Sequence, residues 1–141
     1  MIVYEPVKEL CEWANKGIFG WGEWDGQSKA IGQVIDEKLV SVVTYSDFKY
    51  SPDRGFYSCE MGIYSIDKRW CNRHYLKTVF SYPFIQLGLE RVQTVCNSED
   101  EGVIMFNQKL GFKKEGVHRK AWHTGQDAIS WSMLRGECKW L

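Results

Sequence analysis

Apolar and polar positions follow two different periods along this chain, and the changes between them predict its elements. Residues 4–15 have apolar side chains at helical spacing, which predicts a first helix that ends at Gly17. Lys29–Ile35 and Leu39–Tyr45 are rich in β-branched residues and are separated by three charged residues, which predicts an antiparallel hairpin. Between helix and hairpin, Gly17–Gln27 contains four glycines and several aromatic residues, so we expect a mobile loop there.

The middle of the chain reads as strand, helix and strand. Gly55–Tyr64 alternates as a strand should, and it carries Glu60 as a carboxylate in mid-strand. Arg73–Leu87 has apolar residues three and four apart, which predicts a helix that Pro83 should kink. Arg91–Cys96 follows as another strand. A strand, helix and strand in this order predict a right-handed parallel crossover.

The C-terminal third has the clearest pattern. Within Glu99–Glu137, an amphipathic helix is expected to end at Gly111, and two strands follow it, joined by a short turn at Gly125–Asp127. The second of these strands should end near Arg135. The last third of the chain is therefore predicted to be a helix followed by a β-hairpin.

Specific residues accompany this order. The helix ends in Leu110–Phe112, with the sequence Leu-Gly-Phe, and Glu115–Gly116 and Arg119 come next. The hairpin ends in Met133–Arg135. This combination resembles the C-terminal half of the GNAT acyltransferases, the superfamily related to histone acetyltransferases. The resemblance extends over about Ala30–Arg135 and is strongest after the strand that begins at position 91.

The resemblance implies an α/β fold of the GNAT acyl-CoA N-acyltransferase type, with a mixed central β-sheet flanked by helices. It implies one GNAT-like acetyltransferase domain over residues 1–141, a length that suffices for a single core. The run Glu115–Arg119 with the hairpin after it looks most like the branch that acts on protein N-termini, the RimJ/RimL-like branch, which includes small chains of phage or bacterial type.

The implied activity is transfer of an acetyl group from acetyl-CoA to a primary amine, by direct attack within a ternary complex. The acceptor is left open between a protein N-terminus and a small-molecule amine, because one fold hosts many functions. The alternative is a catalytically weak or inactive GNAT-like module that binds CoA or a protein partner. The oligomeric state is open between monomer and homodimer, since the edge of the C-terminal hairpin could pair with a second copy.

The turn Ile66–Tyr75 is where a GNAT protein holds the pyrophosphate of acetyl-CoA. A helix N-terminus suits an anion, and arginines add donors that fit phosphate. Usually this turn contains closely spaced glycines, but His74 and Leu76 occupy those positions here, so a plain solvated turn is the alternative. The resemblance implies a set of cofactor-binding residues along the preceding strand, the turn and the C-terminal helix: Ile63, Tyr64, Ser65, Ile66, Arg69, Arg73, His74, Tyr75 and Asn107.

Two polar residues are the catalytic candidates. Glu60 lies where some GNAT enzymes have a general base, which takes a proton from the attacking ammonium. The alternative is a glutamate on the solvent side of its strand. Asn107 stands where many GNAT enzymes have a tyrosine that protonates the leaving thiolate; its helical face is otherwise apolar, so it should have a hydrogen-bond partner. That partner is either CoA or the backbone of the protein itself.

Composition excludes several other classes. Lysine and arginine number 18 and so do aspartate and glutamate, and no basic stripe with interleaved aromatics exists, so nucleic acid is not an expected partner. The sequence has neither a membrane-length apolar run nor a signal peptide, which predicts a cytoplasmic protein that does not bind membranes. Motifs of hydrolases, NTPases and zinc proteases do not occur.

The five cysteines and seven tryptophans need separate interpretation. The cysteines form no C-x-x-C pair and should be reduced, with Cys59 and Cys96 as small core residues, so no metal is expected; zinc held by a mixture of Cys59, Cys71, His74 and Cys96 has no motif spacing behind it. Three of the tryptophans crowd the N-terminal third, where they fill the core or line a surface groove: Trp13, Trp21 and Trp24.

Overall fold

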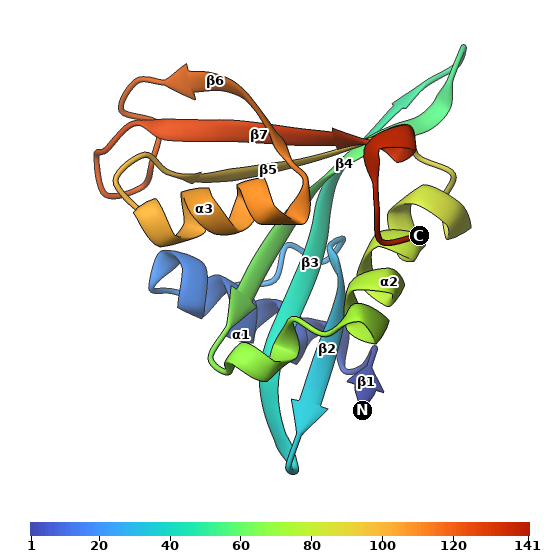
Figure 1. Cartoon of the computed structure of the whole chain (residues 1–141), viewed down its shortest axis with the longest axis vertical. Coiled ribbons are helices and arrows are strands. Elements are labelled where there is room, and N and C mark those ends of the chain that lie inside the picture. Colours follow the sequence, from blue (N-terminus) through green and yellow to red (C-terminus); the bar gives the residue numbers. More distant parts are fainter.

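A computed structural model describes all residues 1–141, and its centre is a seven-stranded sheet of order β1-β2-β3-β4-β5-β7-β6 (Figure 1). The strands are β1 (Ile2–Val3), β2 (Lys29–Ile35), β3 (Lys38–Ser51), β4 (Gly55–Ser65), β5 (Arg91–Asn97), β6 (Lys113–His118) and β7 (Ala128–Leu134). The main helices are α1 (Val7–Phe19), α2 (Arg73–Ser81) and α3 (Glu101–Leu110).

Strand pairing is antiparallel everywhere except between β4 and β5, which run parallel. The sheet is therefore mixed. The parallel pair confirms the predicted crossover through α2, and the β2–β3 pair confirms the predicted hairpin, although β3 continues to Ser51, well beyond the expected end at Tyr45. The strand β6 lies at the free edge of the sheet.

The helices divide between the two faces of the sheet. Helix α1 buries Leu10, Cys11 and Ala14 against Ala30 and Val42, which forms a small cluster on one face. The main core lies on the other face, where α2 and α3 cover the sheet and where the largest buried side chains gather, among them Tyr45, Phe80, Phe84 and Trp131. None of the helices combines the length and the hydropathy that crossing a bilayer requires.

Helix α1 corrects one prediction, because it runs through Gly17 and ends instead at Gly20, whose φ of 83° gives the left-handed cap. Gly17 is required by packing rather than by chain reversal. A Cβ atom there would lie 2.3 Å from the ring of Tyr64 on β4. The missing side chain thus allows α1 to rest directly on β4, where Trp13 also meets the Tyr64 ring edge-on at 5.3 Å.

The helices α2 and α3 begin at side-chain caps and end as their sequences direct. Asn72 accepts a hydrogen bond from the N–H of Tyr75 at the start of α2, and Asp100 accepts one from Val103 at the start of α3. After Ser81 the α-helical pattern gives way to a π turn, Tyr82–Gln86, which contains the proline expected to disturb it. Gly111 ends α3 with a φ of 107°, as predicted.

The connection between β6 and β7 differs from the expected short turn. It covers residues 119–127, and Gly125–Asp127 is only its last part. Backbone hydrogen bonds between Trp122 and Gln126, and from Gly125 to Trp122, close it internally. The hairpin therefore carries a folded loop that reaches toward α1.

The close contact between α1 and β4 can be tested with Gly17→Ala. The added methyl group would overlap the Tyr64 ring, so the free energy of unfolding should fall by about 1–3 kcal/mol. Gly102→Ala is the matched control: it lies within α3, its Cβ would meet nothing nearer than 3.6 Å, and helix propensity should make it stabilising by up to about 1 kcal/mol. Denaturant unfolding measures both; equal stabilisation of the two variants would contradict the packing account.

Candidate functional site

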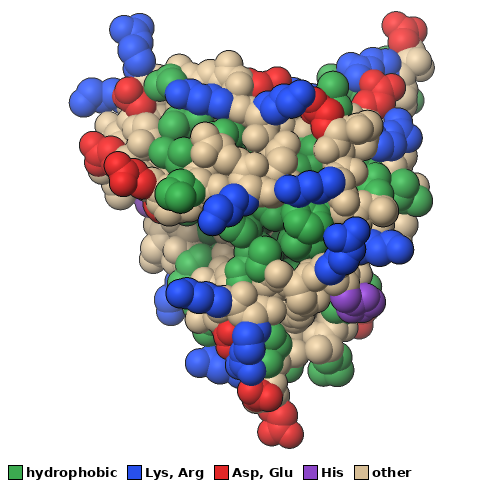
Figure 2. Space-filling model, in the orientation of Figure 1, with side chains coloured by type: hydrophobic (Ala, Val, Ile, Leu, Met, Phe, Trp, Pro, Cys, Tyr) green, Lys and Arg blue, Asp and Glu red, His purple; other side chains and the backbone are tan.

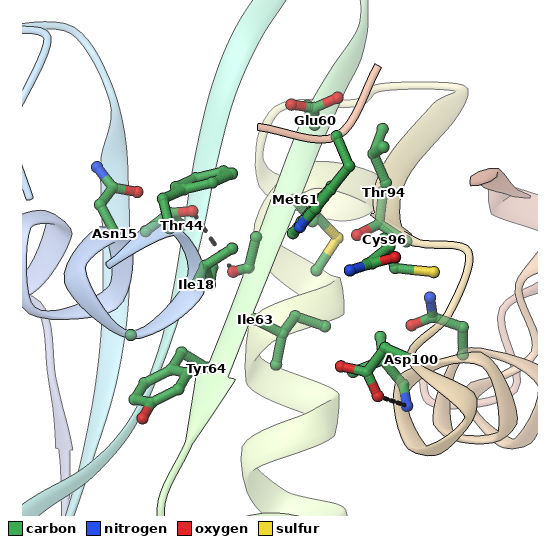
Figure 3. A pocket seen from close by; sticks show the side chains of 18 of the residues that line it. Asn15, Ile18, Thr44, Glu60, Met61, Ile63, Tyr64, Thr94, Cys96 and Asp100 are labelled. Carbon is green, nitrogen blue, oxygen red and sulfur yellow. Dashed lines mark hydrogen bonds between the residues drawn. The ribbon is translucent and has the colours of Figure 1, made fainter. Parts of the chain in front are cut away.

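A cavity of about 520 Å³ opens where β4 and β5 separate (Figure 3). The two strands pair only between Ser58–Glu60 and Arg91–Gln93, at their N-terminal ends. Beyond Glu60, β4 stays with β3 while β5 stays with β7, so the facing edges of the two parallel strands lose their partners. Unpaired backbone groups at this gap are free to bind a ligand.

The register shows which backbone groups face the gap. Ile66 donates its N–H to the carbonyl of Val40 on β3. Because alternate residues of an antiparallel strand face the same neighbour, Tyr64 also bonds to β3 while Ile63 faces β5. Of the two amides expected to hold the pantetheine arm, the one at Ile63 is therefore available, and the one at Tyr64 belongs to the sheet.

The lining residues of the cavity come from both faces of the sheet, so we divide it into two chambers that meet at the gap. On the face covered by α1, which we call the α1 chamber, the lining residues include Asn15, Ile18, Phe19, Thr44, Ser46 and Glu60. On the face covered by α3, which we call the α3 chamber, they include Met61, Ile63, Thr94, Cys96, Asp100, Val103, Phe106 and Asn107. A ligand in the gap would thus touch both chambers.

Glu60 lies in the α1 chamber, beside Ser46 of β3. It shares this face of β4 with Gly62, where an added Cβ would approach the Ile18 side chain on α1 to 3.4 Å. Burial and, to a smaller extent, the Asp47 carboxylate raise the pKa of Glu60, which the Gln93 side chain partly opposes. A carboxylate with a raised pKa in a cavity is suited to accept a proton near neutral pH.

Asn107 lies in the α3 chamber and is 3% exposed. Its side-chain Nδ2 has no hydrogen-bond partner anywhere in the protein. The partner that its apolar helical face required is therefore missing from the protein itself. A buried amide donor left unpaired costs about 1–3 kcal/mol, which a ligand acceptor in the cavity would recover.

The turn before α2 is only partly free for an anion. The N–H groups of Arg73 and His74 lie in the first turn of α2 and have no acceptor within the helix. No other group of the protein accepts a hydrogen bond from them. Arg69, by contrast, is occupied: its guanidinium bonds to Asp67 at 2.7 Å and to Asp36 at 3.1 Å. The same guanidinium lowers the pKa of Asp67 to about 2.

The remaining residues expected at this turn have internal roles. The Ser65 hydroxyl donates to the Asp67 carbonyl at 3.1 Å. The Tyr75 side chain is fully buried, and its hydroxyl donates to the Ile31 carbonyl at 2.7 Å, so it belongs to the core. Of the predicted site residues, the structure therefore brings four together at one cavity: Glu60, Ile63, Tyr64 and Asn107. Ser65 and the residues of the turn lie outside it.

Positive side chains gather on the α2 and α3 side of the molecule. Figure 2 shows lysine and arginine side chains bordering a hollow with a hydrophobic floor, below α3 and beside α2. Trp70, which is buried, lies between these helices, with its ring 5.2 Å from that of Phe106 on α3. This basic rim is suited to a phosphate-bearing ligand.

Aromatic side chains close one end of the α1 chamber. The Phe19 ring at the end of α1 lies 5.8 Å from Trp122 and 5.4 Å from His123, both in the connection between β6 and β7. All three residues line the cavity. Sequence periodicity did not indicate this contact, since it joins segments 103 positions apart. The only signal was a tryptophan next to a histidine in a mostly polar connection.

The tryptophans of the N-terminal third were expected either to fill the core or to line a surface groove. Trp13 packs on Tyr64, and Trp24 donates its indole N–H to the Ser28 carbonyl at 3.0 Å, so both support the structure around α1. Trp21 is 59% exposed and approaches only Phe19, with ring centroids 6.4 Å apart. It stands beside the chamber without lining it.

The cysteines are all free thiols, and Cys59 and Cys96 are buried in the core as predicted. Burial raises the pKa of Cys59 to about 12. Cys96 instead accepts a hydrogen bond from the indole of Trp131 at 3.3 Å. Histidine, cysteine, aspartate and glutamate side chains form no group of three that could hold a metal ion.

Solved acetyltransferase structures resemble this fold closely. A probable acetyltransferase has a TM-score of 0.66 at 18% identity over 78% of this chain and 62% of its own. The spermidine/spermine N-acetyltransferase SpeG from Vibrio cholerae has a TM-score of 0.74 at 14% identity, over 96% of this chain and 95% of its own. A ribosomal-protein-S5-alanine acetyltransferase from Vibrio fischeri has a TM-score of 0.67 at 17% identity, over 98% and 94% of the two chains.

The chain therefore has the GNAT acetyltransferase fold, as the Leu-Gly-Phe segment and its hairpin predicted. It spans 62% of the length of the probable acetyltransferase and nearly the whole length of the other two structures. No protein-family model and no curated protein matches the sequence.

The environment of Glu60 can be tested through the pH dependence of stability. Because its pKa is raised above the ordinary 4.5, the folded state favours the protonated form, and the carboxylate destabilises the fold once the pH rises above that range. Glu60→Gln cannot ionise, so it should be more stable than the wild type at pH 7, and this advantage should shrink as the pH falls toward 4. Chemical unfolding at several pH values measures the difference.

Glu115→Gln provides a control of opposite sign. Arg91 bonds to Glu115 at 2.9 Å and lowers the pKa of that carboxyl, so this pair contributes stability above the ordinary pKa and loses it as the pH falls. The Glu115→Gln variant should therefore be less stable than the wild type at pH 7. A Glu60→Gln variant that behaved in the same way would show that Glu60 is not in a desolvated site.

Proposed function

We propose that the chain, as one GNAT-like domain over residues 1–141, is an N-acetyltransferase that moves an acetyl group from acetyl-CoA to a primary amine. The observation that carries this function is the gap between β4 and β5, where a buried unpaired amide, a free strand edge and a desolvated carboxylate meet in one cavity. Two of the structural neighbours are named for their acceptors. One is a spermidine/spermine N-acetyltransferase and the other a ribosomal-protein-S5-alanine acetyltransferase, and both acceptors are amines.

The α3 chamber fits the donor. The free edge of β4 at Ile63 offers the N–H that we assign to the thioester carbonyl oxygen, where a donor stabilises developing negative charge. We assign the unpaired Nδ2–H of Asn107 to the sulfur atom of the same thioester. The amide can donate a hydrogen bond but cannot release a proton, so the leaving thiolate would take its proton from water or from another side chain.

The nucleotide end is assigned to the start of α2. The two free N–H groups at Arg73 and His74, together with the positive end of the helix dipole, attract a pyrophosphate. The guanidinium of Arg73 forms no ion pair with the protein, whereas that of Arg69 is held by two carboxylates. Arg73 is therefore the arginine of this turn that we assign to phosphate.

The α1 chamber fits the acceptor. Glu60 there would take the proton that an ammonium must lose before its nitrogen can attack the thioester carbonyl. A pKa raised by burial keeps this carboxyl a stronger base than an exposed glutamate. The acceptor then reaches the donor through the gap in the sheet, so the attack is direct and needs no acylated residue on the protein.

One observation favours the alternative of a CoA-binding module with weak or no catalysis. The turn before α2 has side chains where closely spaced glycines would let a phosphate approach, and Arg69 is already paired with Asp36 and Asp67. A protein of this kind would still bind CoA through Asn107 and the free edge at Ile63. Binding without transfer to any amine would identify it.

Calorimetric titration with acetyl-CoA, CoA and dephospho-CoA tests the donor site. We expect micromolar binding of acetyl-CoA. Dephospho-CoA should bind more weakly, because it lacks a phosphate that the basic rim would attract. If none of the three ligands gave detectable binding heat, the result would contradict the proposed function. The fold would stand in that case, since it rests on the structural comparisons.

Asn107→Leu sharpens this test, because a structural and a ligand-binding asparagine respond differently. Leucine has a similar shape and leaves no unpaired donor, so the free protein should be at least as stable as the wild type. Acetyl-CoA should bind about tenfold more weakly, which corresponds to one lost hydrogen bond to a ligand. Lower stability with unchanged affinity would place Asn107 in the framework of the protein instead.

A further inference from the structure

We propose that the acceptor is a monoamine whose single ammonium group is attached to an aromatic or similarly flat apolar body, and that Phe19 and Trp122 are the residues that select it. This inference rests on the proposed function and names the substrate class of the same site. Its basis is the combination, in one chamber, of a ring-lined end and a single carboxylate.

The charges lining the cavity are the first observation. Neither lysine nor arginine lines it, and its carboxylates are Glu60 in the α1 chamber and Asp100 in the α3 chamber. Asp100 is turned to its own helix, where it caps the N–H of Val103 at 3.1 Å. The α1 chamber therefore offers one anionic group, which favours a cation over a neutral or acidic acceptor.

The number of charges limits the acceptor further. A polyamine carries several ammonium groups, and each one needs a carboxylate or water when it is bound. The carboxylate that acts on Glu60 is that of Asp47, which is exposed and paired with Lys49 at 3.2 Å. Apart from the His123 imidazole at the aromatic end, the rest of the chamber has uncharged side chains, with hydroxyl groups at Thr44 and Ser46. One ammonium fits this arrangement, and a chain of ammonium groups does not.

The aromatic end is the second observation. Phe19, Trp122 and His123 approach one another with ring centroids 5.1–5.8 Å apart, and all three line the cavity. The ring surfaces that face the cavity can pack on another flat ring, and their π faces also attract a cation. An acceptor with its amine at Glu60 would place its apolar body against these rings.

The position of the rings supports a role in selection rather than in folding. Phe19 is the last residue of α1, and Trp122 belongs to the connection between β6 and β7. Their contact therefore joins a helix end to a loop and is not part of the main core. Trp122 is only partly buried. Replacing it should affect the chamber more than the stability of the sheet.

Three amines serve as probes in an acetyl-transfer assay that measures CoA release: 2-phenylethylamine, spermidine and a short peptide with a free N-terminal alanine. We expect 2-phenylethylamine to have a kcat/KM at least about tenfold above the other two. Trp122→Ala should raise its KM by about three- to tenfold with little change in kcat. A preference for spermidine or for the peptide would overturn the inference and leave the proposed function intact.

Trp21→Ala is the matched control, because Trp21 approaches the Phe19 ring but does not line the cavity. Its KM for 2-phenylethylamine should stay at the wild-type value. Phe19→Leu is a second variant that keeps the apolar volume and removes the ring face, and it should also raise KM if Trp122→Ala fails to fold. Unchanged KM in every folded chamber variant would overturn the role of these rings.

Calorimetry of the same three amines with the wild-type protein, alone and with saturating CoA, makes the inference independent of turnover. If acetyl-CoA does not bind, the proposed function fails, and the amine titrations still decide the acceptor class. Selective binding of 2-phenylethylamine, weakened by Trp122→Ala, supports the inference. Absence of binding by 2-phenylethylamine under both conditions, together with no transfer to it, overturns it.

Discussion

The separation of β4 from β5 is the constraint on which the rest of this structure depends. Two parallel strands that pair over three residues and then diverge leave backbone donors and acceptors without partners inside the fold. Such groups are costly unless a ligand or water satisfies them. The divergence is maintained because each strand is paired on its other side beyond the point of separation, β4 with β3 from Glu60 to Ser65 and β5 with β7 to Asn97. The gap is therefore a stable feature of the sheet and passes from one face to the other.

Helix packing sets what surrounds the gap. The glycine at position 17 lets α1 rest on the ring of Tyr64, which brings the end of that helix, and Phe19 with it, to one mouth of the cavity. On the opposite face, the cap at Gly111 and the core residue Leu110 fix α3 so that Asn107 points into the other chamber. Packing contacts thus determine which chemistry each chamber holds: a desolvated carboxylate on one face and an unpaired amide on the other.

Much of this fold was predictable, and the failures have physical reasons. β-Branched residues on either side of a short charged connection identified the β2–β3 hairpin, and the Leu-Gly-Phe segment identified the last helix, because these signals are local. The predicted end of α1 at Gly17 was wrong. This glycine does not stop the helix; it is needed because the Tyr64 ring, on a distant strand, leaves no room for a side chain. Glu60 and Asn107 were identified as site candidates by resemblance, but the contact of Phe19 with Trp122 joins the two ends of the chain, and sequence periodicity contains no information about it.

The most direct test of the central claim is the backbone amide signal of Ile63 in a two-dimensional NMR spectrum during titration with CoA. If the free edge of β4 binds the ligand, the Ile63 amide should shift and become protected from hydrogen exchange, while the Tyr64 amide, already bonded to β3, should keep its protection unchanged. An Ile63 amide that is protected in the free protein, or that stays unchanged at saturating CoA, would contradict the account of an open strand edge as the binding site.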